Sequence, residues 1–172
     1  PERQPAGARV VRLTTQFYEG ATGVRGGLEE IESATPAGEA LRAEIGRHLA
    51  EVTAREFRTL GLQLGYWYED SPICVADGTP PPPDDPQNYH ACARPGSRAP
   101  HVPLADGRST LDCFGSGFTL LRLGSQAGDT SALERAFADR AVPLSVTSLA
   151  EPEVLAAYEQ PLVLVRPDGQ IG

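Results

Sequence analysis

Residues 93–124, ARPGSRAPHVPLADGRSTLDCFGSGFTLLRLG, decide how this chain folds. Pro95-Gly96 and Asp106-Gly107 are typical of turns, because glycine tolerates positive φ and aspartate accepts hydrogen bonds from neighbouring backbone. We expect residues 101–104 and 109–114 to form the two arms of a hairpin around the second turn. A hairpin therefore leads into the last part of the stretch.

Residues 118–123 are almost wholly apolar, which predicts a central strand covered on both faces. Further on, Ser131 and Glu134 fit a capping box at the start of a helix. Residues 144–147 then alternate apolar and hydroxyl side chains, as a strand does. Two strands joined by a helix predict a right-handed crossover between parallel strands.

The end of the chain continues this pattern. Residues 151–158 predict a second short helix, and residues 162–165 predict a strand that is apolar on both faces and therefore central. Pro167-Asp168-Gly169 predicts a turn into a last hairpin strand at residues 170–172. This order of elements is typical of a thioredoxin-like domain. The predicted fold class is α/β: a thioredoxin-like domain, with a mixed central sheet flanked by helices, preceded by a helical segment.

The first third of the chain is predicted to be helical. Apolar residues at helical spacing predict a helix over residues 6–18 and a long one over residues 36–57, with a short piece at residues 28–34 between them. Thr35-Pro36 is a strong start signal for the long helix. We expect this helix to dock on the thioredoxin-like core. The first helix is expected to make few contacts within the chain. Its apolar stripe, formed by Val10, Leu13 and Phe17, should pack on a second copy or be poorly ordered.

Two segments connect these regions. Residues 62–68 alternate in polarity and size, which predicts a strand. Residues 79–86, TPPPPDDP, cannot join a helix or a ladder, because proline lacks an N–H and fixes φ. We interpret them as an extended surface loop that acts as a rigid connector, and a proline-rich ligand for a signalling domain is the alternative.

Composition excludes several classes of protein. A net charge of −8 argues against nucleic acid or an anionic membrane as a partner, since both need a basic face. No apolar run approaches the ~20 residues of a spanning helix, and we predict a soluble, cytoplasmic protein. Cys74, Cys92 and Cys113 show neither metal-ligand nor dithiol spacing, so free thiols in a reducing compartment are expected.

Three motifs carry a resemblance to a known family. RPGSRAPH at residues 94–101, DGRSTLD at residues 106–112 and GFTLL at residues 117–121 follow one another in order. Together they resemble the C-terminal domain of FAD-dependent aromatic hydroxylases, the class A flavoprotein monooxygenases that act on phenols and aromatic polyketides. The resemblance extends to LVLVRPDG at residues 162–169 and back to LGLQLGYWYEDSPICV at residues 60–75.

The resemblance implies a division of the chain. Residues 61–172 would be the thioredoxin-like C-terminal domain, and residues 1–60 the helical tail of the preceding substrate domain with a connecting helix. Glu2-Arg3-Gln4-Pro5 resembles the end of the family's Tyr-x-x-Glu-Arg-x-Pro segment, so we expect a piece of a longer polypeptide. At residues 170–172 the sequence departs from the family pattern, so the resemblance does not decide whether a last edge strand forms there.

The resemblance also implies cofactors and partners. The parent enzyme would use FAD and NAD(P)H, but this chain has no G-x-G-x-x-G turn and is expected to bind neither and to be inactive alone. Its partner would be the N-terminal FAD-binding and substrate half of the same enzyme, with a homo-oligomer as the expected assembly. The role would be structural or in oligomerisation.

Polar residues in the central stretch are the candidate site. These residues are Arg94, Arg98, His101, Arg108 and Asp112. They could brace their own loops by hydrogen bonds or face another domain. Asp112 could form an ion pair with Arg108 or Arg94. Residues 124–129, where a thioredoxin-type redox centre would lie, hold no cysteine. Two alternatives remain: a thiol- or peroxide-handling enzyme, and a stand-alone thioredoxin-fold interaction module.

Overall fold

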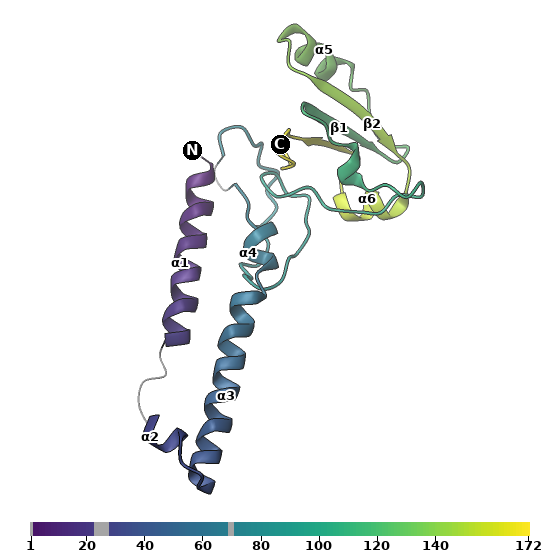
Figure 1. Cartoon of the computed structure of the whole chain (residues 1–172). Coiled ribbons are helices and arrows are strands. Elements are labelled where there is room, and N and C mark those ends of the chain that lie inside the picture. Colours follow the sequence, from purple (N-terminus) through teal and green to yellow (C-terminus); the bar gives the residue numbers. More distant parts are fainter. Residues whose placement is uncertain (1, 23–27, 69–70) are drawn as a thin grey trace.

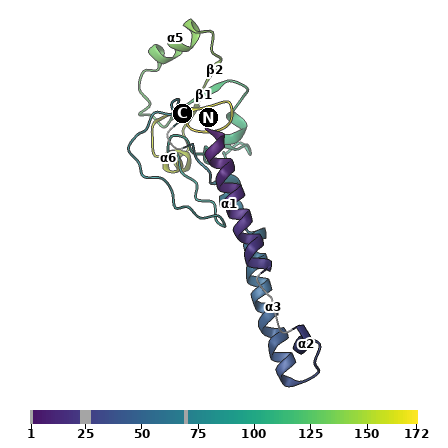
Figure 2. The ribbon, with the colours of Figure 1, turned by 90° about the vertical axis from the view of Figure 1, so that its left-hand side faces the viewer.

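The computed structural model describes residues 2–22, 28–68 and 71–172, and it shows a helical arm attached to an α/β body (Figure 1). The arm consists of α1 (Arg3–Thr22), α2 (Leu28–Ile31) and α3 (Pro36–Phe57). In the view turned by 90° the arm remains narrow, with α1 lying against α3 (Figure 2). Among the described residues, no helix has the length and apolar character needed to cross a membrane.

The long helix α3 begins where the sequence predicted. The Thr35 hydroxyl accepts a hydrogen bond from the Gly38 backbone N–H at 3.2 Å, and Pro36 occupies the first turn. A side chain at position 38 would place its Cβ only 2.4 Å from the Ser33 carbonyl oxygen, so glycine lets the preceding segment pack closely. Arg42 fastens that segment by donating to the carbonyl oxygens of Ile31 and Ser33.

The packing of the arm corrects one prediction. α3 packs against α1 and α2 and not on the sheet: a Cβ on Gly20 of α1 would lie 3.7 Å from the Val52 side chain of α3. α1 is likewise covered by α3 rather than left without contacts. Of its stripe, Leu13 is buried, Phe17 is half-buried and Val10 remains 39% exposed. The arm therefore covers itself only in part.

The predicted strand at residues 62–68 is wrong. Leu60–Leu64 forms a helical turn, α4, and only Trp67 pairs as an isolated bridge, with Ser97. Tertiary contact decides the outcome, because the Leu62 N–H donates to the Pro86 carbonyl at 3.0 Å. A Cβ on Gly61 would lie 1.8 Å from the Asp85 carbonyl oxygen, so the predicted irregular loop lies directly on α4.

The sheet has the predicted parallel crossover. β1 (Phe118–Leu123) pairs in parallel with β2 (Leu144–Leu149), and α5 (Ser131–Asp139) connects them. β3 (Leu162–Val165) pairs antiparallel with β1, so the order is β2-β1-β3. This arrangement confirms the thioredoxin-like fold class. β3 lies between β1 and the last residues of the chain, as expected for a central strand: Val165 bridges to Ile171, and the Gly172 N–H donates to the Leu164 carbonyl at 2.9 Å.

One face of the sheet carries the main core. α6 (Pro152–Tyr158) covers this face, and two of its own side chains, Val154 and Tyr158, are fully buried. The Tyr158 hydroxyl donates to the Pro100 carbonyl at 2.8 Å, and burial raises its pKa to about 12. The core connects strand residues with the loop before them: Ala99, Val102, Leu104, Leu121, Leu123, Leu149, Val163, Val165 and Ile171.

Two local predictions around this core are also corrected. The second hairpin arm is not a strand: Thr110–Cys113 forms a 3-10 helix, and only Pro103 and Ser109 pair across the turn. The reason is that the Asp112 carboxylate bonds the Ser109 N–H and hydroxyl, which closes a capping box. At α5 the N-cap is Thr130, one residue earlier than predicted.

The contacts around the Pro100 carbonyl give a first prediction. Tyr158→Phe removes one of its two donors and should lower the free energy of unfolding by ~1 kcal/mol. Thr110→Val removes the second donor, which bonds at 2.7 Å, and also the acceptor of the Val102 N–H, so it should cost more. Urea denaturation of both variants tests this ranking. A Tyr158→Phe cost equal to or above that of Thr110→Val would contradict the assignment.

Candidate functional site

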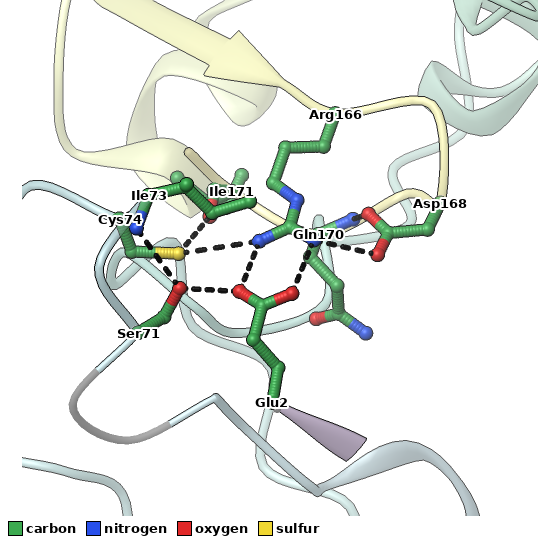
Figure 3. A network of polar contacts seen from close by, with 8 residues as sticks. All are labelled: Glu2, Ser71, Ile73, Cys74, Arg166, Asp168, Gln170 and Ile171. Carbon is green, nitrogen blue, oxygen red and sulfur yellow. Dashed lines mark hydrogen bonds and ion pairs between the residues drawn. The ribbon is translucent and has the colours of Figure 1, made fainter.

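The most developed polar site of the described chain is centred on Arg166, directly after β3 (Figure 3). The turn over residues 166–170 places it, with the Arg166 N–H bonded to the Gln170 carbonyl at 2.8 Å and Gly169 at a φ of 78°. Arg166 directly follows β3 (Leu162–Val165), in which Val163 and Val165 are buried, and only 8% of the Arg166 surface is exposed. A charged group this buried must find partners in the fold.

Two carboxylates neutralise the Arg166 guanidinium. Its Nη1 donates to Glu2 Oε1 at 2.7 Å and its Nη2 donates to Glu2 Oε2 at 2.9 Å, the bidentate geometry that makes such pairs strong. Nη2 also donates to Asp168 Oδ2 at 3.0 Å. Glu2 stands next to the start of α1, so the pair joins the arm to the end of the sheet across most of the chain.

Weaker contacts complete the site. The Ser71 hydroxyl donates to Glu2 Oε1, and Cys74 Sγ accepts from Arg166 Nη1 at 3.5 Å. Cys74 also donates to the Ile171 carbonyl at 3.7 Å. The guanidinium carbon lies 5.1 Å from the centre of the Tyr68 ring, within cation–π range. Three separate parts of the chain therefore meet at one cation, as Figure 3 shows for the polar groups.

The electrostatics of the site favour the charged pair. The hydrogen bond from Arg166, followed by that from Ser71, lowers the pKa of Glu2 to about 2. The Glu2 carboxylate in turn raises the pKa of Arg166. Neither group changes its charge near neutral pH, so the pair is suited to holding segments together and not to transferring protons.

The pair gives a second prediction. Arg166→Ala should lower the free energy of unfolding at pH 7 by about 1.5–3 kcal/mol, the range for hydrogen bonds to charged groups. Arg108→Ala is the matched control, because Arg108 pairs with Asp106 at an exposed position, where such pairs contribute ~0–1 kcal/mol.

Low pH should remove the difference in unfolding free energy between Arg166→Ala and Arg108→Ala. The Glu2 pKa is depressed in the folded state, so the stability it contributes is present above about pH 4.5 and is lost as the pH falls toward 2. Denaturant titrations of the wild type and both variants between pH 7 and pH 2 measure this. An Arg166→Ala effect that equals the Arg108→Ala effect, or that persists unchanged at pH 2, would contradict the role of the pair.

The residues proposed from the sequence lie elsewhere. Arg108 Nε donates to Asp106 Oδ2 at 2.8 Å, so Arg108 does not pair with Asp112, whose carboxylate is bonded to Ser109. Arg94 Nε donates to the Thr79 carbonyl at 3.1 Å. The backbone of Arg98 bridges to Gln170, and His101 is exposed. The structure therefore does not bring these five residues together around one centre.

The sequence contained a signal for Arg166 that was missed. An arginine directly follows the apolar strand LVLV, with Asp168 two residues later, and a charge at the end of a buried strand needs a partner. Glu2 entered the interpretation of the sequence only as part of the motif Glu2-Arg3-Gln4-Pro5. Nothing in a single sequence states that these residues, so far apart in the chain, meet in space.

The cysteines of the described residues form neither a disulfide nor part of a metal-ligand cluster. Cys74, Cys92 and Cys113 are unpaired, and burial raises the pKa of the Cys113 thiol. Those residues hold no cluster of metal-ligating side chains.

A flavin pyrophosphate needs free N–H groups at a helix start, and the starts of α3 and α5 do not fit. The start of α3 is closed by its own preceding backbone, where the Gly38 Cβ position meets the Ser33 and Glu30 carbonyls. At the start of α5 the Asp129 carboxylate already accepts from the Ser131 N–H at 3.0 Å and would repel an anion.

The chain is similar to several known proteins. Residues 92–172 match the family model "Aromatic-ring hydroxylase, C-terminal". The FAD-dependent monooxygenase apdD of Emericella nidulans is 38% identical over 122 residues, which are 65% of this chain and 19% of that protein.

Two solved structures are similar over 99% of the chain. The rebeccamycin biosynthetic enzyme RebC, with reduced flavin, has a TM-score of 0.82 at 37% identity, and the chain covers 31% of it. The flavin-dependent monooxygenase PieE, in complex with FAD and substrate, has a TM-score of 0.75 at 30% identity, with 35% covered. The chain thus spans about a fifth to a third of the length of these relatives.

Proposed function

From the premise that this chain belongs to the C-terminal part of the aromatic-ring hydroxylases, we propose that it is the structural, non-catalytic domain of an FAD- and NAD(P)H-dependent aromatic hydroxylase. Its substrate class would be a phenol or an aromatic polyketide. FAD, the nicotinamide and the reacting ring would all bind in the remaining part of the enzyme.

One observation carries the structural role. The most buried charge cluster of the described chain, Arg166 with Glu2 and Asp168, joins the arm to the body. Catalytic carboxylates and bases have pKa values near the working pH, whereas this cluster is fixed in its charged state. The geometry of the cluster supports a structural domain, because it ties the start of α1 to the turn after β3.

We further propose that the chain divides at residue 60, as the resemblance implied. Residues 1–60 hold the arm helices, and residues 61–172 hold the α/β body. The arm would be the tail of the substrate domain, and the ion pair from Glu2 to Arg166 would be the fixed joint between the two parts. The partly covered apolar stripe of α1 supports this division.

The arm also offers a surface for the catalytic half. A groove of about 540 Å³ lies between α1 and α4, with Val10, Leu62 and Tyr66 among its lining residues. A Cβ built on Gly7 in this groove meets nothing within 4 Å. Exposed Val10 and Val11 continue the apolar surface along α1. We propose that the catalytic half of the same polypeptide packs here, since an apolar groove of this kind gains stability when covered.

A chimera with RebC tests the proposal. In it, the C-terminal 31% of RebC to which this chain corresponds is replaced by residues 1–172. The chimera should fold and retain FAD after desalting, measured by flavin absorbance. RebC truncated at the same point should lose FAD, because its arm-binding surface is uncovered, and the isolated chain should retain none.

Matched glycine variants in the chimera test the groove. Gly7→Trp should weaken FAD retention by filling the groove, whereas Gly46→Trp on α3 should not, although both positions are open helical glycines. A chimera no better than the truncation, or stoichiometric FAD on the isolated chain, would overturn the structural role. Equal effects of the two tryptophans would overturn the groove assignment alone.

A further inference from the structure

The outer edge of β2 has no partner among the described residues. The strand order β2-β1-β3 places β2 at one margin of the sheet, paired only with β1. Alternate N–H and C=O groups of such a strand point away from the sheet and can accept a further strand. The other margin differs, because Val165 of β3 bridges to Ile171.

The edge also lacks the usual protection. Natural edge strands carry lysine, proline, a bulge or an inward charge that prevents pairing with another chain. β2 reads LSVTSL over residues 144–149, with neither charge nor proline, and keeps an unbroken register with β1 over all six residues. Val146 is 40% exposed on it. At about 3.3 Å per residue the free edge is ~20 Å long, a normal length for a paired strand.

An apolar groove lies beside this edge. About 400 Å³ of space separates α5 from β2, with Val142, Leu144 and Val146 on one side and Phe137 on the other. None of the nine residues of α5 is buried, although Phe137 packs edge-on against Phe118 of β1 with 5.3 Å between the ring centres. An amphipathic helix with no buried residue leaves apolar surface for a further contact.

The position of the groove argues for its occupant. The catalytic half is expected at the arm, and the joint from Glu2 to Arg166 lies beyond β3, at the opposite margin from β2. Figure 1 likewise shows α5 and β2 at the end of the molecule away from α2. Glu134 and Arg135 stand side by side at the groove, so a copy related by a twofold axis can bring opposite charges together.

We propose that β2 pairs antiparallel with β2 of a second copy of this chain around a twofold axis. The two three-stranded sheets then form one continuous sheet of six strands. Each groove beside α5 is covered by the partner, and Glu134 of each copy faces Arg135 of the other. This inference goes beyond the proposed function, because it names the oligomerisation surface and does not require the chain to serve a hydroxylase.

Oligomeric state in solution tests the interface with the full 172-residue chain. Sedimentation equilibrium should give a dimer for the wild type at micromolar concentrations. Val146→Lys introduces a charge of the kind that protects natural edges, and it should raise the dimer dissociation constant about tenfold or more. Val75→Lys is the control, since Val75 is 79% exposed and lies outside both β2 and the arm, and it should leave the constant unchanged.

A charge swap separates specific pairing from loss of apolar surface. Glu134→Arg should weaken the dimer, Arg135→Glu should weaken it likewise, and the double variant should recover it. Circular dichroism confirms that each variant is folded. A monomeric wild type, a Val146→Lys dimer of unchanged affinity, or a dimer dissociated by Val75→Lys instead would overturn the proposal. A double variant no tighter than either single one would overturn it too.

Discussion

Arg166 brings a full positive charge into a nearly closed part of the fold, and much of the surrounding structure compensates for it. The turn after β3, the segment at Cys74 and the first residue of the described chain all supply partners. Removing a charge from water costs several kcal/mol unless its partners are close and well oriented. Glu2 meets that requirement with two hydrogen bonds, and so fixes where α1 leaves the body.

That constraint explains the shape of the molecule. The body is held by its own core under α6, whereas the arm shares little apolar surface with the sheet. The polar joint therefore has a larger part in orienting the arm than its size alone suggests. A second ion pair, between Arg9 and Asp84, links α1 to the proline-rich loop and supports the same orientation.

Local signals predicted the elements that depend on local physics. The Thr35-Pro36 start, the buried strand at residues 118–123 and the parallel crossover follow from capping, periodicity and chain connectivity. Residues 60–64 became helical because their backbone bonds a distant loop, which periodicity in a short window cannot reveal. The site was missed for the same reason: its members lie more than 160 residues apart, as Arg166 and Glu2 show.

Hydrogen–deuterium exchange on Glu2→Gln tests most directly whether the joint orients the arm. Glutamine keeps the shape of the side chain but removes its charge, so the pair with Arg166 is weakened without a cavity. We expect faster amide exchange over residues 7–14 of α1, while β1 keeps its protection, because local openings follow local stability. Unchanged exchange in α1, or an equal loss of protection in α1 and β1, would contradict it.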